Sequence, residues 1–214
     1  MAVIVITGAN RGIGLALCRQ LCHEYSVHAL CRNASPQLQA LPLTIHEGVD
    51  VRNPKTIPQE LPSIDILINN AGILCRDSLS ALSVSDIQEQ FVVNSLGPLL
   101  TTQALLSKLS SGSKVVIVTS RMGSVADNTS GGMYGYRMSK AAVNMAGMSL
   151  SRDLKPKGIA VALLHPGFVR TDMTGGNGYI SAEESAKGLI DQIHRLSLET
   201  TGVFWHCNGE ELPW

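Results

Sequence analysis

Residues 3–14 read Val-Ile-Val-Ile-Thr-Gly-Ala-Asn-Arg-Gly-Ile-Gly, and this stretch decides the fold. A run of β-branched residues leads directly into a turn that contains Gly8, Gly12 and Gly14, and apolar residues then recur every four positions. That order predicts a strand, a tight turn and an amphipathic helix. Glycines allow close backbone approach, and free N–H groups at a helix N-terminus can hold a pyrophosphate. The turn could also be a tight loop without a ligand, but its place at the start of a βαβ unit favours a dinucleotide.

The rest of the chain continues this alternation of short apolar runs and helical patterns, which is typical of a parallel sheet built from βαβ units. We expect one doubly wound α/β sheet of seven parallel strands with helices on both faces, in a single domain over residues 1–214. The predicted strands are Val3–Thr7, Ser26–Leu30, Leu43–Glu47, Ile64–Asn69, Lys114–Thr119, Ile159–His165 and Gly202–His206.

Local signals predict several helix boundaries. Serine followed three residues later by an acid predicts capping boxes at Ser83 with Asp86 and at Ser181 with Glu184. The second crossover is short, since 35–41 leaves room for about two helical turns. Three prolines in the third crossover restrict any helix there to a fragment.

The overall composition excludes several classes of protein. The chain has 214 residues, with 17 Lys and Arg against 17 Asp and Glu, so its formal net charge is zero. A neutral chain without a basic block does not suit a protein that binds nucleic acid by neutralising phosphates. No apolar run approaches the ~20 residues of a membrane helix, and the first residues lack the pattern of a secretory signal. We therefore expect a cytoplasmic protein with a small-molecule partner, no nucleic-acid partner and no membrane partner.

The five cysteines are interpreted as free thiols. Their number is odd, and no CxxC pair occurs among them. Cys18 and Cys22 lie one helical turn apart beside His23, a spacing that could suggest metal ligands. Two thiols on an apolar helix face are more often core residues. No metal is expected.

Two further motifs follow in order along the chain. Residues 69–72 read Asn-Asn-Ala-Gly after the fourth predicted strand, and Tyr136 precedes Lys140 by four residues. With the GxxxGxG spacing of the first turn, these motifs resemble the short-chain dehydrogenase/reductase family, and the likeness spans essentially the whole chain. The segments YRMSKAA and HPGFVRTDM and the ending GEELPW resemble its C-factor-like and sniffer-like carbonyl reductases. The resemblance implies a Rossmann fold and an NAD(P)-dependent oxidoreductase.

The end of the second predicted strand indicates which nucleotide the site prefers. An NAD site usually has a carboxylate there, about 20 residues after the glycines, to accept the ribose 2′-OH. This chain has Cys31, Arg32 and Asn33 instead, so no acid would repel a 2′-phosphate. Arg32 and Arg11 could both pair with that phosphate through their forked donors, although either could simply cover the surface. The sequence favours NADP(H), with NAD(H) possible.

The family resemblance implies the remaining cofactor contacts. Asp50 would contact the adenine, although on its own it is equally well explained as a turn residue. The Asn-Asn-Ala-Gly segment would hold the adenosine side, and the Pro-Gly segment after the sixth strand would lie near the nicotinamide. The expected cofactor-binding residues are Gly8, Asn10, Arg11, Gly12, Ile13, Arg32, Asp50, Val51, Asn70, Ala71, Gly72, Tyr136, Lys140, Pro166, Gly167, Val169 and Thr171.

Tyr136 and Lys140 are four residues apart and therefore lie on the same side of a helix. A nearby ammonium and an oxidised nicotinamide would lower the tyrosine pKa from its ordinary value near 10. Tyr134 lies six residues before the lysine, off that face, so Tyr136 is the expected proton donor. Without the other motifs, such a pair would be an ordinary exposed pair on a helix.

Two polar residues complete the catalytic set that the resemblance implies. Ser120 ends the fifth predicted strand, where it would hold the substrate carbonyl oxygen, with Ser124 as the competing candidate. Asn94 lies four residues before Pro98, which cannot donate to its carbonyl, so the helix should bend there and leave that oxygen free. In the family this asparagine holds a water that links the lysine to solvent. The expected catalytic residues are Asn94, Ser120, Tyr136 and Lys140.

The substrate end of the site is expected to be open. Only residues 174–180 separate Met173, the last residue of the HPGFVRTDM segment, from the last helical pattern. Many relatives have a substantial lid here. The candidate walls are apolar and partly flexible, although each could equally be core. These candidates are Cys75, Met122, Met133, Phe168 and Met173. They suit a small lipophilic aldehyde, ketone or quinone.

The sequence thus predicts an NADPH-dependent carbonyl reductase that works by hydride transfer, with Tyr136 as proton donor. The alternative is an NADP(H)-binding regulatory or signalling protein of C-factor type with little turnover. An epimerase or dehydratase of the extended branch is disfavoured because the chain has no C-terminal substrate domain. Family members commonly dimerise through the helices that fall here at about 83–109 and 134–154, so a homodimer is expected.

Overall fold

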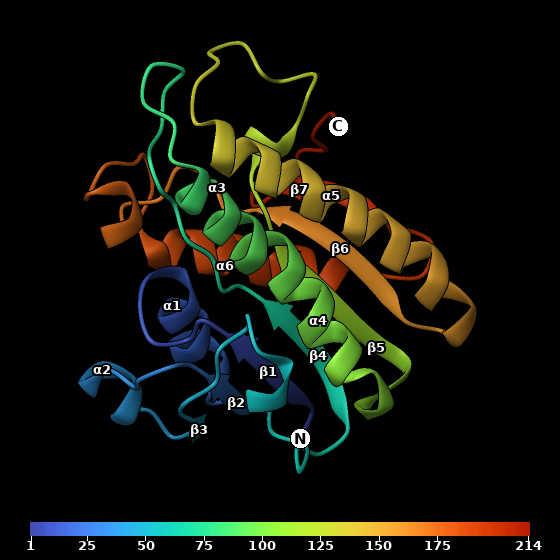
Figure 1. Cartoon of the computed structure of the whole chain (residues 1–214). Coiled ribbons are helices and arrows are strands. Elements are labelled where there is room, and N and C mark those ends of the chain that lie inside the picture. Colours follow the sequence, from blue (N-terminus) through green and yellow to red (C-terminus); the bar gives the residue numbers. More distant parts are fainter.

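A computed structural model describes all 214 residues and contains one seven-stranded sheet in which every pair of neighbouring strands is parallel. The strand order is β3-β2-β1-β4-β5-β6-β7. From β1 the chain moves outward through β2 and β3, and then returns to β4 on the other side of β1 (Figure 1). In open α/β sheets, ligands bind beyond the carboxyl ends of the strands where the order reverses. This topology therefore points to the ends of β1 and β4.

All seven predicted strands are present. They are β1 (Val3–Thr7), β2 (Ser26–Leu30), β3 (Thr44–His46), β4 (Ile64–Asn69), β5 (Leu109–Val118), β6 (Ala160–His165) and β7 (Val203–His206). β5 begins five residues before the predicted Lys114, because Leu109 already pairs with Ile64 and the register then shifts between Ile64 and Ile66. The residues between are polar, so no apolar pattern marked them as strand.

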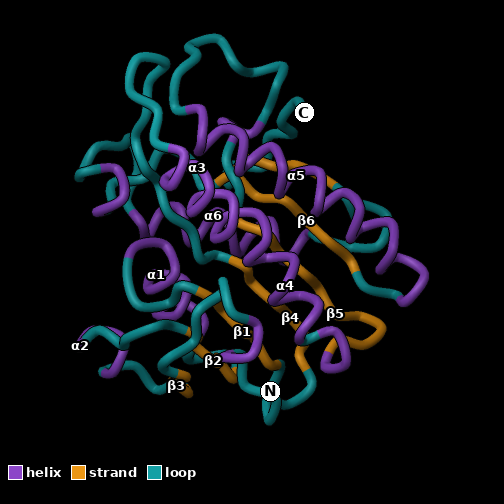
Figure 2. Tube along the Cα trace, viewed as in Figure 1, coloured by secondary structure: helices purple, strands orange, loops and turns teal.

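Helices cover both faces of the sheet, as expected (Figure 2). They are α1 (Gly12–Leu21), α2 (Pro36–Gln39), α3 (Val84–Phe91), α4 (Gly97–Ala104), α5 (Tyr134–Leu154) and α6 (Ala182–Arg195). Successive residues of a strand point to opposite faces. Ile4 and Ile6 of β1 therefore join the core under α1 and α6, while Val5 joins the core on the opposite face. Both Cys18 and Cys22 are buried in the first of these cores.

The helix that contains Asn94 is interrupted where Pro98 predicted a bend. A π-helical turn, Val92–Leu96, separates α3 from α4, and the Gly97 N–H donates to the Val92 carbonyl five residues back. Pro98 has no N–H to continue the α-helical ladder, and a π turn is one way in which a helix absorbs such a break.

The helix caps agree with the sequence in part. Ser181 and Glu184 form the full capping box, with the Glu184 N–H donating to Ser181 Oγ at 3.1 Å and the Ser181 N–H donating to Glu184 Oε2 at 2.7 Å. Ser83 accepts from the Asp86 N–H, but the Asp86 carboxylate makes no return bond, so the second predicted box is only half formed. The shorter side chain of Asp explains the difference.

The second crossover contains less helix than predicted. α2 has four residues, which is one turn rather than two, and Ser35 caps it. Pro42 follows closely, and the residue before a proline is disfavoured in helical geometry. The third crossover contains only a short 3-10 turn, Pro54–Thr56, as the prolines predicted.

No helix of the structure combines the length and apolar character needed to cross a bilayer.

Candidate functional site

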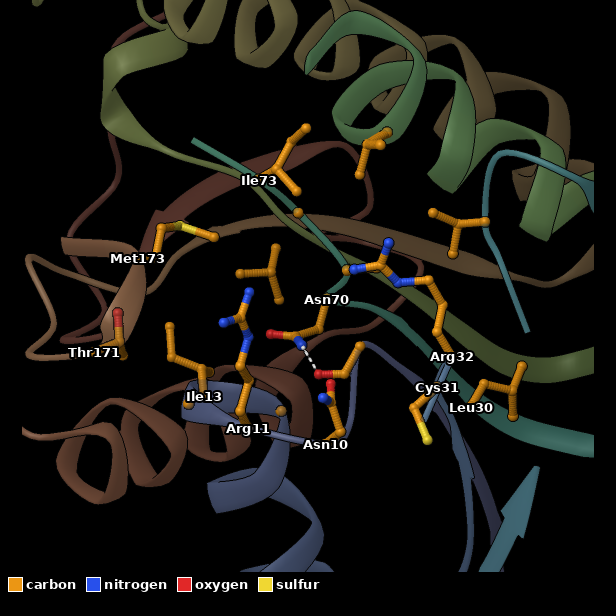
Figure 3. Close-up of a pocket in the computed structure, with 18 of the residues that line it drawn as sticks. Asn10, Arg11, Ile13, Leu30, Cys31, Arg32, Asn70, Ile73, Thr171 and Met173 are labelled. Carbon is orange, nitrogen blue, oxygen red and sulfur yellow. Dashed lines mark hydrogen bonds between the residues drawn. The ribbon is translucent and has the colours of Figure 1, made fainter. Parts of the chain in front are cut away.

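A cavity of about 410 Å³ lies at the carboxyl ends of β1, β2 and β4, where the fold directs a ligand. Figure 3 shows side chains from these strand ends, from the first turn and from the segment after β6 around the same space. All the predicted cofactor-binding residues except Gly167 and Val169 line this cavity. Val169 is 3% exposed and bridges to Ile180, and Gly167 lies against Ile180 and Cys207.

The glycine turn packs directly against the Asn-Asn-Ala-Gly segment. A Cβ on Gly8, whose φ is +66°, would lie 2.8 Å from Ala71 Cα, and one on Gly14 would lie 2.2 Å from the Gly8 carbonyl oxygen. Asn70 Nδ2 donates to the Thr7 carbonyl at 3.0 Å. It also donates to the Gly8 carbonyl at 3.1 Å, a bond drawn as a dashed line in Figure 3. The Thr7 hydroxyl in turn accepts from the N–H groups of Asn70 and Ala71. Only glycine fits where these two segments meet.

The first turn of α1 offers donors to an anion. Arg11, its N-cap residue, makes no side-chain cap, so the first N–H groups of the helix keep no side-chain acceptor. These groups face the cavity beside Gly12 and Ile13. The N-terminus of such a helix is the usual binding site for the pyrophosphate of a dinucleotide.

Two arginines lie at the cavity, as the sequence predicted. Figure 3 shows the guanidinium groups of Arg11 and Arg32 both directed into it. Arg11 is 3.8 Å from Asp172 in an exposed ion pair, whereas Arg32 has no carboxylate partner. Cys31 and Asn33 lie beside Arg32 in the lining, so this part of the cavity has no acid at the position that would hold an NAD ribose.

Asp50 lines the cavity with its carboxylate already paired. Arg52 Nη2 donates to Asp50 Oδ2 at 2.6 Å, and Arg52 Nε donates to the same oxygen at 2.9 Å. The Arg52 hydrogen bond holds the pKa of Asp50 below its ordinary value. The carboxyl is thus a fixed, ionised group.

Tyr136 and Lys140 both reach the cavity from α5. Lys140 Nζ lies 5.7 Å from the centroid of the Tyr136 ring and donates to the Val118 carbonyl at 3.1 Å. Burial lowers the pKa of Lys140 to about 8. Tyr134, by contrast, is 37% exposed and does not line the cavity.

Burial opposes the drop in the Tyr136 pKa that was expected beside Lys140 and an oxidised nicotinamide, and a lowered pKa with bound nucleotide stays a prediction. Burial raises the pKa of Tyr136 to about 12, and a hydrogen bond with the Ser120 side chain offsets only part of that rise. Burial dominates because the phenolate loses hydration, while the Lys140 ammonium is itself desolvated. The phenol is therefore protonated at neutral pH, which is the form that can donate a proton.

Ser120, rather than Ser124, lies beside the phenol. Ser120 is 6% exposed, and its Oγ accepts from the Met122 N–H at 3.1 Å. The Ser124 hydroxyl accepts from the Asp127 N–H, inside the loop that follows. The structure therefore places Ser120 beside the phenol of Tyr136, which lines the cavity together with Lys140, whereas Ser120 itself does not line it.

Asn94 is buried behind the cavity wall. Its Oδ1 accepts from the Ile73 N–H at 2.9 Å, and its Nδ2 donates to the Ile73 carbonyl at 2.9 Å and to Ser139 Oγ at 3.0 Å. A Cβ on Gly72 would be 3.3 Å from Asn94 Oδ1 and 3.8 Å from Lys140 Nζ. The Asn94 amide and the Lys140 ammonium therefore both lie next to Gly72. The side chain thus anchors the wall, and a water on its main-chain carbonyl stays a prediction.

The substrate candidates are spread more widely. Met173 lines the cavity, whereas Cys75, Met122, Met133 and Phe168 do not. Phe168 packs edge-on against Tyr179, with ring centroids 5.4 Å apart. Burial raises the pKa of the Cys75 thiol, which keeps it in the less reactive protonated form.

Several lining residues were not assigned to the site from the sequence. Most follow strand ends or glycine turns, which is the signal that could have found them. They are Gly14, Leu30, Cys31, Asn33, Val49, Arg52, Ile73, Glu89, Val93, Val118, Thr119 and Asp172.

Known proteins match both the sequence and this geometry. The chain is 40% identical over 227 residues to 1-hydroxy-2-glutathionyl-2-methyl-3-butene dehydrogenase of Rhodococcus sp. (strain AD45), and the match covers 100% of both chains. It is 47% identical over 156 residues to C-signal of Myxococcus xanthus, covering 71% of this chain and 93% of that protein.

Solved structures agree. NADPH-bound carbonyl reductase from chicken fatty liver and carbonyl reductase Sniffer of D. melanogaster each superpose with a TM-score of 0.90, at 29% identity and with 100% of both chains covered. The family model described as short chain dehydrogenase matches residues 2–178. The chain therefore belongs to the short-chain dehydrogenase family, and its structural neighbours are sniffer-like carbonyl reductases.

Proposed function

We propose that this oxidoreductase reduces a small lipophilic aldehyde, ketone or quinone to the alcohol with NADPH. The observation that carries the proposal is that Tyr136 and Lys140 share one cavity with the glycine turn and Arg32, while Ser120 adjoins the phenol. NADP(H) is the cofactor that the structural neighbours support, since one is NADPH-bound and a Burkholderia multivorans relative, at 26% identity, has bound NADP. When bound, the nicotinamide supplies the hydride.

The residues of the chain would supply the proton. Tyr136, which burial keeps protonated, donates its hydroxyl proton to the substrate oxygen while Ser120 orients that oxygen. The phenolate that results is stabilised by the ammonium of Lys140, 5.7 Å from the ring centroid. We assign Asn94 to the return of the proton from solvent, through a water on its carbonyl.

The cavity fits the proposed cofactor by its shape and charge. Gly8 and Gly14 pack so closely against residues 70–71 and against each other that the glycine turn is fixed at the cavity, and the uncapped start of α1 provides donors for a pyrophosphate. Arg32, with help from Arg11, would pair with a 2′-phosphate, and we propose on this basis that NADP(H) is preferred over NAD(H).

The substrate class is the finer part of the proposal. Met173 offers an apolar, partly exposed side chain at the cavity, which supports a lipophilic carbonyl. The 40% identical Rhodococcus relative is named for a glutathione conjugate, so such a conjugate belongs in the substrate panel beside simple aldehydes, ketones and quinones.

We also propose that the whole chain is one domain and works as a cytoplasmic homodimer. Phe91 of α3, Leu99 of α4, and Met138 and Met145 of α5 are exposed apolar residues on the helices expected to pair. Burial of such residues against a second copy is favourable. All five cysteines are free, which supports a reducing compartment.

A regulatory protein that binds NADP(H) with little turnover is the second candidate, and the 47% identity to C-signal favours it. One experiment separates the two. Loss of NADPH absorbance is followed with the substrate panel for the wild type and for Tyr136→Phe, and NADPH binding is measured by titration. Turnover that Tyr136→Phe abolishes while NADPH still binds supports the reductase. Tight binding without turnover supports the regulator, and no binding refutes both.

A further inference from the structure

A carboxylate outside the cavity holds the start of the helix that bears Tyr136. Asp77 lies in the loop after β4, and its two carboxylate oxygens accept from the N–H groups of Tyr134 at 2.5 Å and Gly135 at 2.8 Å. Its main-chain carbonyl also accepts from the Met133 N–H at 3.4 Å. These contacts join segments 56 or more residues apart, and they end one residue before Tyr136. Figure 1 shows the loop after β4 and the loop before α5 rising together at this end of the molecule.

α5 has no cap of its own. Its N-cap residue, Met133, makes no side-chain cap and has left-handed backbone, with φ 52° and ψ 43°. It is the one residue other than glycine with positive φ, and a side chain in that region is strained. Asp77 therefore provides, from a distant loop, the acceptor that an N-cap side chain normally provides. Its negative charge is also favourable at the positive end of the helix.

The loop that bears Asp77 is itself fixed on α3 and the π turn. Gln90 Oε1 accepts from the Cys75 N–H at 2.9 Å, and Asn94 bonds both the N–H and the carbonyl of Ile73. Gln90 is fully buried, and a Cβ on Gly135 would lie 2.6 Å from its Nε2. A continuous set of contacts therefore runs from α3 through residues 73–77 to the first turn of α5.

We propose that Asp77 is a positioning residue that sets the place of the Tyr136 hydroxyl relative to Ser120 and the cavity. Without this carboxylate, the N–H groups of Tyr134 and Gly135 lose their acceptors, and the strained Met133 can relax. A displacement of about 1 Å of a reacting group can cost on the order of 100-fold in rate. Since Lys140 and the rest of α5 stay anchored, the expected loss in kcat is about 10-fold. This kinetic consequence rests on the proposed function, whereas the geometric claim does not.

The kinetic test compares three variants. Asp77→Ala removes both acceptors, Asp77→Asn keeps one, and Ser83→Ala is the matched control because it removes the N-cap of α3 instead. We expect kcat to fall about 10-fold in Asp77→Ala and less in Asp77→Asn. The solvent deuterium isotope effect on kcat should rise as kcat falls, since proton transfer is the step impaired. NADPH affinity should stay unchanged. Ser83→Ala should keep wild-type values. An Asp77→Ala protein that melts earlier but keeps the wild-type kcat and isotope effect would overturn the proposal.

A second measurement needs no turnover. The nucleotide-free protein is labelled with ¹³C-tyrosine, and the signal of Tyr136, one of four tyrosines, is identified by its absence in Tyr136→Phe. We expect that signal to shift in Asp77→Ala and Asp77→Asn and to stay in place in Ser83→Ala. If Asp77→Ala does not fold, Asp77→Asn carries the test. An unmoved Tyr136 signal refutes the positioning role even in a protein without activity, whereas absent wild-type turnover refutes only the proposed function.

Discussion

Gly14 is the position where one added methyl group should separate stability from cofactor binding most clearly. In Gly14→Ala the new Cβ would lie 2.2 Å from the Gly8 carbonyl oxygen, about 1.2 Å short of the 3.4 Å of an ordinary contact. It would also lie 2.6 Å from Asn70 Nδ2, the donor that bridges Thr7 and Gly8. Relief of these two contacts moves α1 away from the glycine turn and breaks the Asn70 bridge.

The size of the effect follows from these contacts. Overpacking costs about 1–3 kcal/mol, and two lost hydrogen bonds add about 0.5–1.5 kcal/mol each. Alanine regains about 1 kcal/mol over glycine inside a helix. The net loss is about 3 kcal/mol, which lowers the melting temperature by roughly 6–12 °C in a chain of this size. Because α1 moves with its N–H groups, NADPH should bind at least about 10-fold more weakly, which is about 1.4 kcal/mol.

Gly188→Ala is the control. It lies in α6, where its Cβ would meet the Cys207 carbonyl oxygen at 2.5 Å, away from the cavity. Thermal melting and NADPH titration of both variants are the measurements. Both should lose stability, but only Gly14→Ala should lose NADPH affinity. Wild-type affinity in a folded Gly14→Ala protein would show that the glycine turn does not hold the cofactor.

Three other predictions concern Tyr136, Arg32 and Lys140. Tyr136→Phe should lower kcat by at least about 100-fold with NADPH affinity unchanged, because it removes only the proton donor; residual turnover near the wild-type rate would exclude this role. Arg32→Ala should weaken NADPH about 10-fold or more and leave NADH unaffected, since its partner is the 2′-phosphate, and equal losses for both nucleotides in binding titrations would contradict that assignment. The Lys140 pKa of about 8 predicts that kcat/KM declines as pH rises through about 8, because the ammonium is lost. Lys140→Arg, which stays charged, should lack that decline, and the same limb in both pH profiles would point to another group.

The sequence predicted those parts of the site that are written as short contiguous patterns. The glycine turn, residues 69–72 and the Tyr136 and Lys140 pair each act through neighbours within a few positions, so their spacing reveals them. Pro98 likewise predicted the break after α3, because the missing N–H is a property of one residue.

Features that depend on distant partners were not visible. Asp77 and Gln90 look like ordinary surface residues of a loop and a helix until the fold brings α3, the loop after β4 and α5 together. The early start of β5 follows from pairing with Ile64, not from its own polar residues. The raised pKa of Tyr136 reflects burial, which the spacing to Lys140 does not report.

Because of the π turn between α3 and α4, the relative orientation of the two helices depends on the number of residues between them. A π turn holds one more residue than an α-helical turn, and each residue rotates a helix by about 100°. Deletion of one residue from 92–96 would therefore remove the π turn and rotate one half of this helical segment against the other by about 100°. Gln90 would then leave the loop that it holds, or Thr101 and Thr102 would leave the buried face of α4. A substitution in this segment leaves the helices on either side in phase, whereas an insertion or deletion rotates everything on one side of it.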